Sequence, residues 1–124
     1  MSQETSRTRR VGELIQQELG PLVQNDLRDE RLAWVSILKV DVAPDLKSAR
    51  VHYSCMPGTE ADAHREEVQE SLERAAGYLQ HQLGRRLSLR AIPHLYFAYD
   101  DSLEQGDRMN RLLRSLHDGG SDGE

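Results

Sequence analysis

Apolar residues follow a helical period in three stretches of the chain and a strand-like alternation in three shorter ones. In residues 7–25 they recur every three or four positions, which is typical of an amphipathic helix. A second helical region opens at a capping residue, Thr59 or Asp62, and keeps this period through residues 68–87. Residues 103–116 repeat it once more. We therefore expect three helical regions, with Pro21 either kinking the first or restarting a short turn.

The alternating stretches are residues 34–42, 49–56 and 95–99. The turn sequence "APDLKS" joins the first two, which predicts an antiparallel hairpin. Strict alternation places Trp34 and Val40 on one side of the first strand. We also expect the single tryptophan and the single phenylalanine, Phe97, to lie in the core.

These elements predict an α+β fold in the order helix, strand, strand, helix, bent helix, strand, with a C-terminal helix. The economical arrangement packs the helices on one face of a three-stranded sheet and leaves the other face in solvent. We expect one domain over residues 7–116. A flexible start at residues 1–6 would precede it, and a flexible acidic tail at residues 117–124 would follow it.

Composition narrows the class of protein. No apolar run approaches the roughly 20 residues that a membrane span needs, and the N-terminus lacks the apolar stretch of a signal peptide. The single cysteine, Cys55, can form neither an internal disulfide nor a thiolate zinc site. The five histidines are scattered. We expect a cytoplasmic protein with no metal, no cofactor and no membrane partner.

Charge is distributed unevenly along the chain. The net charge of −5 argues weakly against nucleic acid as a partner. However, residues 60–73 hold six acids and one base, whereas residues 74–94 hold four arginines and no acid. The field around this second segment is therefore expected to be positive although the whole chain is negative.

Three small residues, Ala75, Ala76 and Gly77, lie where the charge changes sign, in the middle of the second helical region. Inside a helix, glycine lowers the helix stability by about 1 kcal/mol relative to alanine, so a structural or functional role for Gly77 is expected. Small residues allow close packing, or a bend that follows the sheet. Alternatively, a break in the helix would free backbone N–H groups, which attract phosphate.

A resemblance to a known family covers roughly residues 7–116. The matching segments are "RVGELIQQELGPLV", "RDERLAWVSILKVDVAPDLKSARVHYS" and "LERAAGYLQHQLGRRLSLRAIPHLYFAYDDSLEQGDRMNRLL". In this order they resemble the ribosome-binding factor A family. The resemblance implies a type-II KH-like fold, in which Ala75-Ala76-Gly77 would form the kink that replaces the Gly-x-x-Gly loop of ordinary KH domains.

The resemblance also implies a non-enzymatic function. A member of this family would bind the 16S rRNA precursor in the immature small ribosomal subunit, at its 5′-terminal and decoding-region helices. It would assist late rRNA processing and subunit maturation, with a role in cold adaptation. Ribosomal proteins and other assembly factors would be further partners, and we expect a monomer.

The RNA-binding candidates are the small residues at the expected kink and the basic residues around them. They are Arg74, Ala75, Ala76, Gly77, His81, Arg85, Arg86 and Arg90. Auxiliary candidates are Arg7, Arg9 and Arg10 at the start of the first helix, and Arg50 on the solvent side of the second strand.

Two other interpretations stay open from the sequence. The acidic segment 60–73 could dock a basic partner such as a ribosomal protein, with RNA contact incidental. The carboxylates of "YDDSLEQGD" could serve acid–base chemistry or bind a cation, but a capped helix start explains them better. No nucleophile or nucleotide-binding motif is present in the sequence, so we predict no enzyme.

Overall fold

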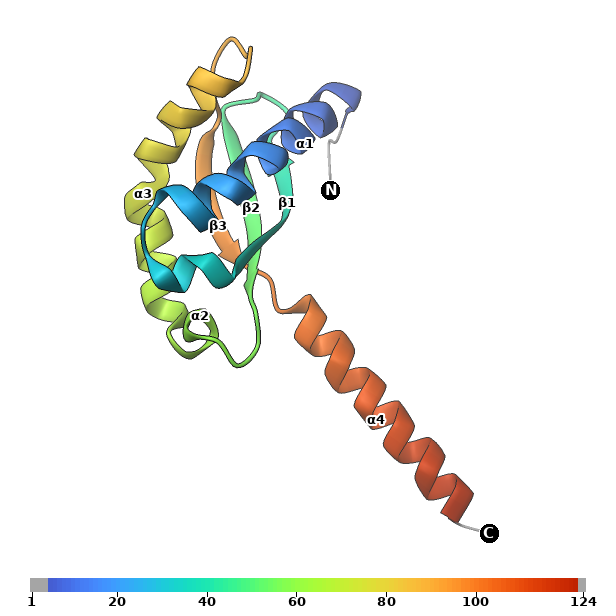
Figure 1. Cartoon of the computed structure of the whole chain (residues 1–124). Coiled ribbons are helices and arrows are strands. Elements are labelled where there is room, and N and C mark those ends of the chain that lie inside the picture. The colour runs from blue at the N-terminus through green and yellow to red at the C-terminus, as the bar shows by residue number, and fades with distance from the viewer. Residues whose placement is uncertain (1–4, 123–124) are drawn as a thin grey trace.

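The computed structural model describes the backbone of residues 5–122 and the side chains of residues 5–102, 105–106 and 108–116. Figure 1 shows the strands and the helices around them. The elements in chain order are α1 (Ser6–Pro21), η1 (Leu22–Asp26), η2 (Glu30–Trp34), β1 (Val35–Val42), β2 (Ser48–Cys55), α2 (Glu60–Ala63), α3 (Arg65–Arg86), β3 (His94–Tyr99) and α4 (Ser102–Asp122). The predicted α+β class is confirmed.

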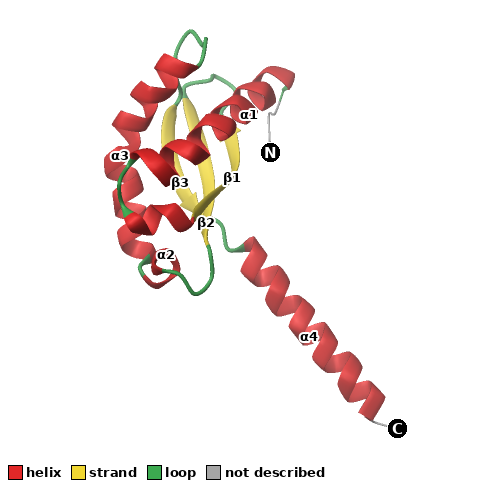
Figure 2. Ribbon diagram, in the orientation of Figure 1, coloured by secondary structure: helices red, strands yellow, loops and turns green. Residues whose placement is uncertain are grey.

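The sheet is mixed, with strand order β1-β2-β3. Strands β1 and β2 form the predicted antiparallel hairpin, whereas β3 runs parallel to β2. Helices α1 and α3 cover the same face of this sheet (Figure 2). Every second residue of β2 is buried beneath them, namely Ala49, Val51, Tyr53 and Cys55. The opposite face lies open, as the alternation in this strand predicts.

Strand β1 departs from strict alternation. Its register against β2 shifts between Ile37 and Lys39, and Val35 and Val40 are both buried. A bulge of this kind inserts one residue and exchanges the two faces of a strand. Trp34 ends η2 just before the strand and is 46% exposed, so its predicted place in the core is wrong. The corresponding prediction for Phe97, which is 8% exposed, is confirmed.

Helix α1 lies close against β1. Gly12 faces Val40, and a Cβ atom at this glycine would collide with the Val40 carbonyl oxygen. The Gln16 side chain donates a hydrogen bond to the Leu38 carbonyl at 3.0 Å. At Pro21 the α-helix passes into η1, a π-helical turn, which places the predicted irregularity at this proline.

The predicted kink at Gly77 is wrong. Residues 65–86 are helical throughout, and the break lies earlier, at His64 between α2 and α3. Figure 1 shows that the α3 axis only curves along the sheet. Leu72 and Leu79, on either side of the glycine, are fully buried and fix both halves of the helix to one surface. Glycine lowers the stability of a helix there without ending it.

Helix α4 extends away from the rest of the molecule (Figure 1). It continues past residue 116, so helical backbone extends into the predicted acidic tail, whose last two residues lie outside the described part. Four large apolar side chains of α4 are more than half exposed: Met109, Leu112, Leu113 and Leu116. None of the helices that the structure describes is both long and apolar enough to cross a bilayer.

Candidate nucleic-acid interface

The outer face of α3 carries a row of basic and aromatic side chains. Steps of four, three and four residues place its members on one side of a helix. We call this row the α3 stripe; it consists of Arg74, Tyr78, His81 and Arg85. All four residues are exposed, and Tyr78 keeps 45% of its surface in solvent. The stripe lies opposite the buried leucines, so no member is needed for the core.

The arginines near the stripe differ in their partners. The Arg74 guanidinium donates a long hydrogen bond of 3.4 Å to the Ser71 hydroxyl. Arg86 approaches Asp26 at 3.8 Å, so its charge is partly compensated within the protein. Among the described side chains, none forms an ion pair with Arg85. Arg74 and Arg85 therefore keep most of their hydrogen-bonding capacity for an external anion.

Ala75 and Ala76 play a different part from the one expected. Both are half-buried and pack against the core, which supports the packing interpretation for these two residues. Gly77 is exposed, with open space where a Cβ would lie. Because α3 does not begin anew at this glycine, there are no freed N–H groups to attract a phosphate. The glycine instead leaves the helix surface beside the stripe low and accessible.

The first half of α3 has the opposite charge. Glu66, Glu70 and Glu73 are exposed along it. Glu67 is engaged within the protein, since it pairs with Arg31 and lies 3.4 Å from His64. The change of sign that is visible in the sequence is thus displayed on the surface of a single helix.

A second basic group lies beyond the end of α3. Arg7 from α1, Lys47 from the β1–β2 turn and Arg90 from the loop before β3 line one cavity of about 250 Å³. The structure therefore brings together two predicted residues, Arg7 and Arg90. Arg9 and Arg10 are also exposed in the first turns of α1. The sequence analysis missed Lys47, whose only signal was its position in the hairpin turn.

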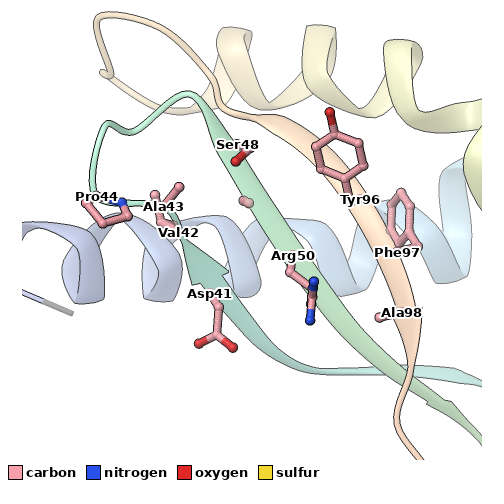
Figure 3. A pocket seen from close by; sticks show the side chains of 10 residues that line it. Asp41, Val42, Ala43, Pro44, Ser48, Arg50, Tyr96, Phe97 and Ala98 are labelled. Carbon is pink, nitrogen blue, oxygen red and sulfur yellow. The ribbon is translucent and has the colours of Figure 1, made fainter. Parts of the chain in front are cut away.

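Arg50 is separated from these residues. It lies on the open face of the sheet, in a wide groove of about 840 Å³ that Asp41 and Tyr96 also line (Figure 3). Asp41 brings negative charge to this groove and also contacts His52 at 2.8 Å. Arg50 thus lies on the solvent side of the sheet, as expected, but on a surface separate from the α3 arginines, and its part in RNA binding stays a prediction.

The acids before α4 support the capping interpretation. The Asp100 carboxylate accepts a hydrogen bond from the Ser102 backbone N–H at 2.8 Å. Hydrogen bonding from the Ser102 side chain, and next from its backbone, holds the pKa of this carboxyl below its usual range. Asp101 accepts the side-chain amide of Gln105 at 3.1 Å. Within the described residues, no three His, Cys, Asp or Glu side chains come together to form a metal site.

Comparison with known proteins agrees with this architecture. The family model described as "Ribosome-binding factor A" matches residues 7–113. A ribosome-binding factor A from Nitrosococcus oceani is 46% identical over 124 residues, covering 100% of this chain and 95% of the relative.

Two structural neighbours share the fold. The crystal structure of ribosome-binding factor A from Thermus thermophilus has a TM-score of 0.63 at 24% identity and covers 74% of this chain and 94% of its own. A homology model of the Thermus thermophilus factor, fitted into a cryo-EM map of its complex with the 30S subunit, has a TM-score of 0.59 at 23% identity, covering 73% and 91%.

These neighbours show that the fold is KH-like. The matched family consists of ribosome-binding factors and not of enzymes. The family model spans most of the domain, and the Nitrosococcus relative aligns over the whole chain. This chain belongs to the ribosome-binding factor A family.

Proposed function

We propose that this protein binds the immature small ribosomal subunit through its rRNA and assists late 16S rRNA processing. The observation that carries the proposal is the α3 stripe, a cationic and aromatic row on the surface of an acidic protein. Membership in a ribosome-binding family supports it. Further support comes from the Thermus neighbour that was fitted into the map of a complex with the 30S subunit.

The chemistry of the stripe suits RNA. The guanidinium groups of Arg74 and Arg85 can each bind a phosphate through paired N–H donors. Between them, the exposed ring of Tyr78 offers a surface on which an unpaired base can stack. The acidic half of the same helix repels other polyanions, which would limit binding to RNA that fits the basic half.

The remaining details extend this proposal. The rRNA contacts would lie at the 5′-terminal and decoding-region helices, and the protein would act in the cytoplasm as a monomer. Ribosomal proteins and other assembly factors would be neighbours on the particle. A role in cold adaptation fits a factor that helps RNA leave misfolded states, since those states persist longer at low temperature.

Charge reversal on the stripe tests the proposal. The Arg74→Glu/Arg85→Glu variant should bind purified small subunits at least about tenfold more weakly, and its affinity should fall less steeply with salt because fewer counterions are released. Co-sedimentation at several salt concentrations gives both quantities. Arg108→Glu/Arg114→Glu on α4 makes the same change of charge at exposed positions away from the stripe and is the matched control. Equal binding by the two double variants would contradict the proposal.

The acidic half of α3 supports a second candidate function, because Glu66 and Glu70 are exposed and could dock a basic ribosomal protein. Glu66→Lys/Glu70→Lys would then abolish co-sedimentation. Under the first proposal the same variant binds subunits at least as well as the unmodified protein, since it adds positive charge beside the stripe.

A further inference from the structure

The basic pocket defined by Arg7, Lys47 and Arg90 has a mainly apolar interior. Three segments that are distant in the sequence meet around it: the start of α1, the β1–β2 turn and the loop between α3 and β3. Its apolar lining comes from Val11, Leu46, Leu89, Ala91 and Pro93. A volume of about 250 Å³ gives room for a flat ring system.

The charge at this pocket is positive. Three cations line it, against one acid, Asp45. The Asp45 carboxylate accepts a hydrogen bond from the Lys47 backbone N–H at 3.0 Å, so it is already used inside the turn. Arg7, Lys47 and Arg90 are exposed, and none of the ion pairs between described residues involves them. A ligand of this pocket should therefore combine negative charge with an apolar surface.

The turn that forms one wall is held in place before any ligand arrives. Leu46 has a left-handed backbone, with φ of 63°, which is uncommon for a bulky residue. Its N–H donates to the Ala43 carbonyl at 2.8 Å. The next carbonyl, of Lys47, accepts a hydrogen bond from the His94 backbone N–H at 2.9 Å, which ties the turn to β3. The lining side chain of Leu46 is thus presented by a fixed backbone.

We infer that this pocket receives one unstacked base of single-stranded rRNA, whose flanking phosphates bind Arg7, Lys47 and Arg90. The inference rests on the proposed function and adds a nucleotide site separate from the α3 stripe. A free phosphate would not need the apolar lining, and an apolar peptide would not need three cations. Proteins commonly recognise RNA through bases that are splayed out of a strand. Since the interior offers mainly apolar contacts, it should distinguish unpaired bases from paired ones, but discriminate little between the four base types.

Filling the pocket without changing its charge tests this inference. Ala91 is exposed, neutral and part of the lining, so Ala91→Trp should occupy the space of the base. Ala63→Trp, at an exposed position at the end of α2, is the matched control. Affinities are measured for purified small subunits, for a labelled single-stranded RNA and for the same strand in a duplex. Thermal unfolding verifies that each variant is folded, and Ala91→Leu replaces the tryptophan variant if it is not.

The expected result is at least a fivefold loss for Ala91→Trp on single-stranded RNA and on subunits, with an unchanged salt dependence and no change on the duplex. Arg7→Glu/Arg90→Glu should instead reduce both the affinity and the salt dependence. Normal binding by Ala91→Trp, or an equal loss on the duplex, would overturn the inference. If the α3 variants lose subunit binding while Ala91→Trp does not, the pocket inference fails and the proposed function stands.

Discussion

Helices α3 and α4 are nearly equal in length, with 22 and 21 residues, and both combine an apolar row with arginines on another side. In α3 the apolar row is buried and only the polar face meets solvent. In α4 both rows are exposed among the described side chains. Similar periodicity therefore produced one helix that is part of the core and one that is not.

The difference follows from what each helix can reach. Helix α3 precedes β3 and lies on the sheet face that the apolar side chains of β2 create. Helix α4 begins after the last strand, when that face is already covered. The open face offers it mainly polar residues, such as Lys39, Arg50 and His52. Apolar spacing thus predicts that a helix forms, whereas a complementary apolar surface decides whether it packs.

The largest expected effect is a difference in stability between equivalent leucines. Leu79→Ala, in the buried row of α3, should lower the free energy of unfolding by about 2–5 kcal/mol, because it leaves a cavity. Leu112→Ala in α4, at a residue 54% exposed, should change it by less than about 0.5 kcal/mol. Urea denaturation of both variants measures the contrast. A similar loss in both would mean that α4 packs against the domain in solution.

A smaller effect is expected at Gly77. Because α3 is continuous there and a Cβ would meet no atom within 4 Å, Gly77→Ala should raise the free energy of unfolding by about 1 kcal/mol. Thermal or urea unfolding tests this. A loss of stability would instead indicate that the domain needs a bend at this glycine in solution. Gly84→Ala near the end of the same helix, where a Cβ would only make an ordinary contact with the Ile92 side chain at 3.7 Å, is the matched control.

The smallest expected effect concerns pH. Arg31 holds the pKa of the Asp29 carboxyl below its usual range, chiefly through side-chain hydrogen bonds at 3.1 and 3.2 Å. Asp29 also accepts a hydrogen bond from Ser71 of α3 at 3.4 Å.

Because the pKa of Asp29 is lower in the folded state, its stabilising contribution is complete above the unfolded pKa. That contribution is lost as the pH falls through the folded value. It should amount to less than about 1 kcal/mol for this partly exposed pair. Urea midpoints between neutral pH and about pH 3 should therefore fall less in Asp29→Asn than in the unmodified protein. Identical pH profiles would show that Asp29 adds nothing to the attachment of α3.

The sequence predicted those parts of the fold that depend on local patterns. Alternation in β2 identified its buried residues, and the "APDLKS" turn identified the hairpin. The bulge in β1 escaped prediction because one inserted residue leaves each half of the strand with a normal pattern. Trp34 was misplaced because the alternation was continued from Val40 across the bulge and past the start of β1, to a residue that belongs to η2.

In the candidate site, too, the sequence predicted the residues that depend on local spacing and not those that depend on tertiary packing. The α3 stripe depends on spacing within one helix, so Arg74, His81 and Arg85 could be proposed from the sequence. The kink was expected from the small residues around Gly77 and from the family resemblance, but the buried leucines on both sides of Gly77 keep the helix continuous. The basic pocket could not be predicted, because Arg7, Lys47 and Arg90 meet only through tertiary packing.

The close approach of α1 to β1 has a consequence for the basic pocket. Gly12 lets the helix rest directly on the Val40 carbonyl, and Arg7 belongs to the same rigid rod a little over one turn earlier. Even a methyl group at position 12 would act as a wedge that tilts this rod and carries Arg7 away from Lys47. The separation of Arg7 and Lys47 across the pocket therefore depends on the absence of a side chain at Gly12.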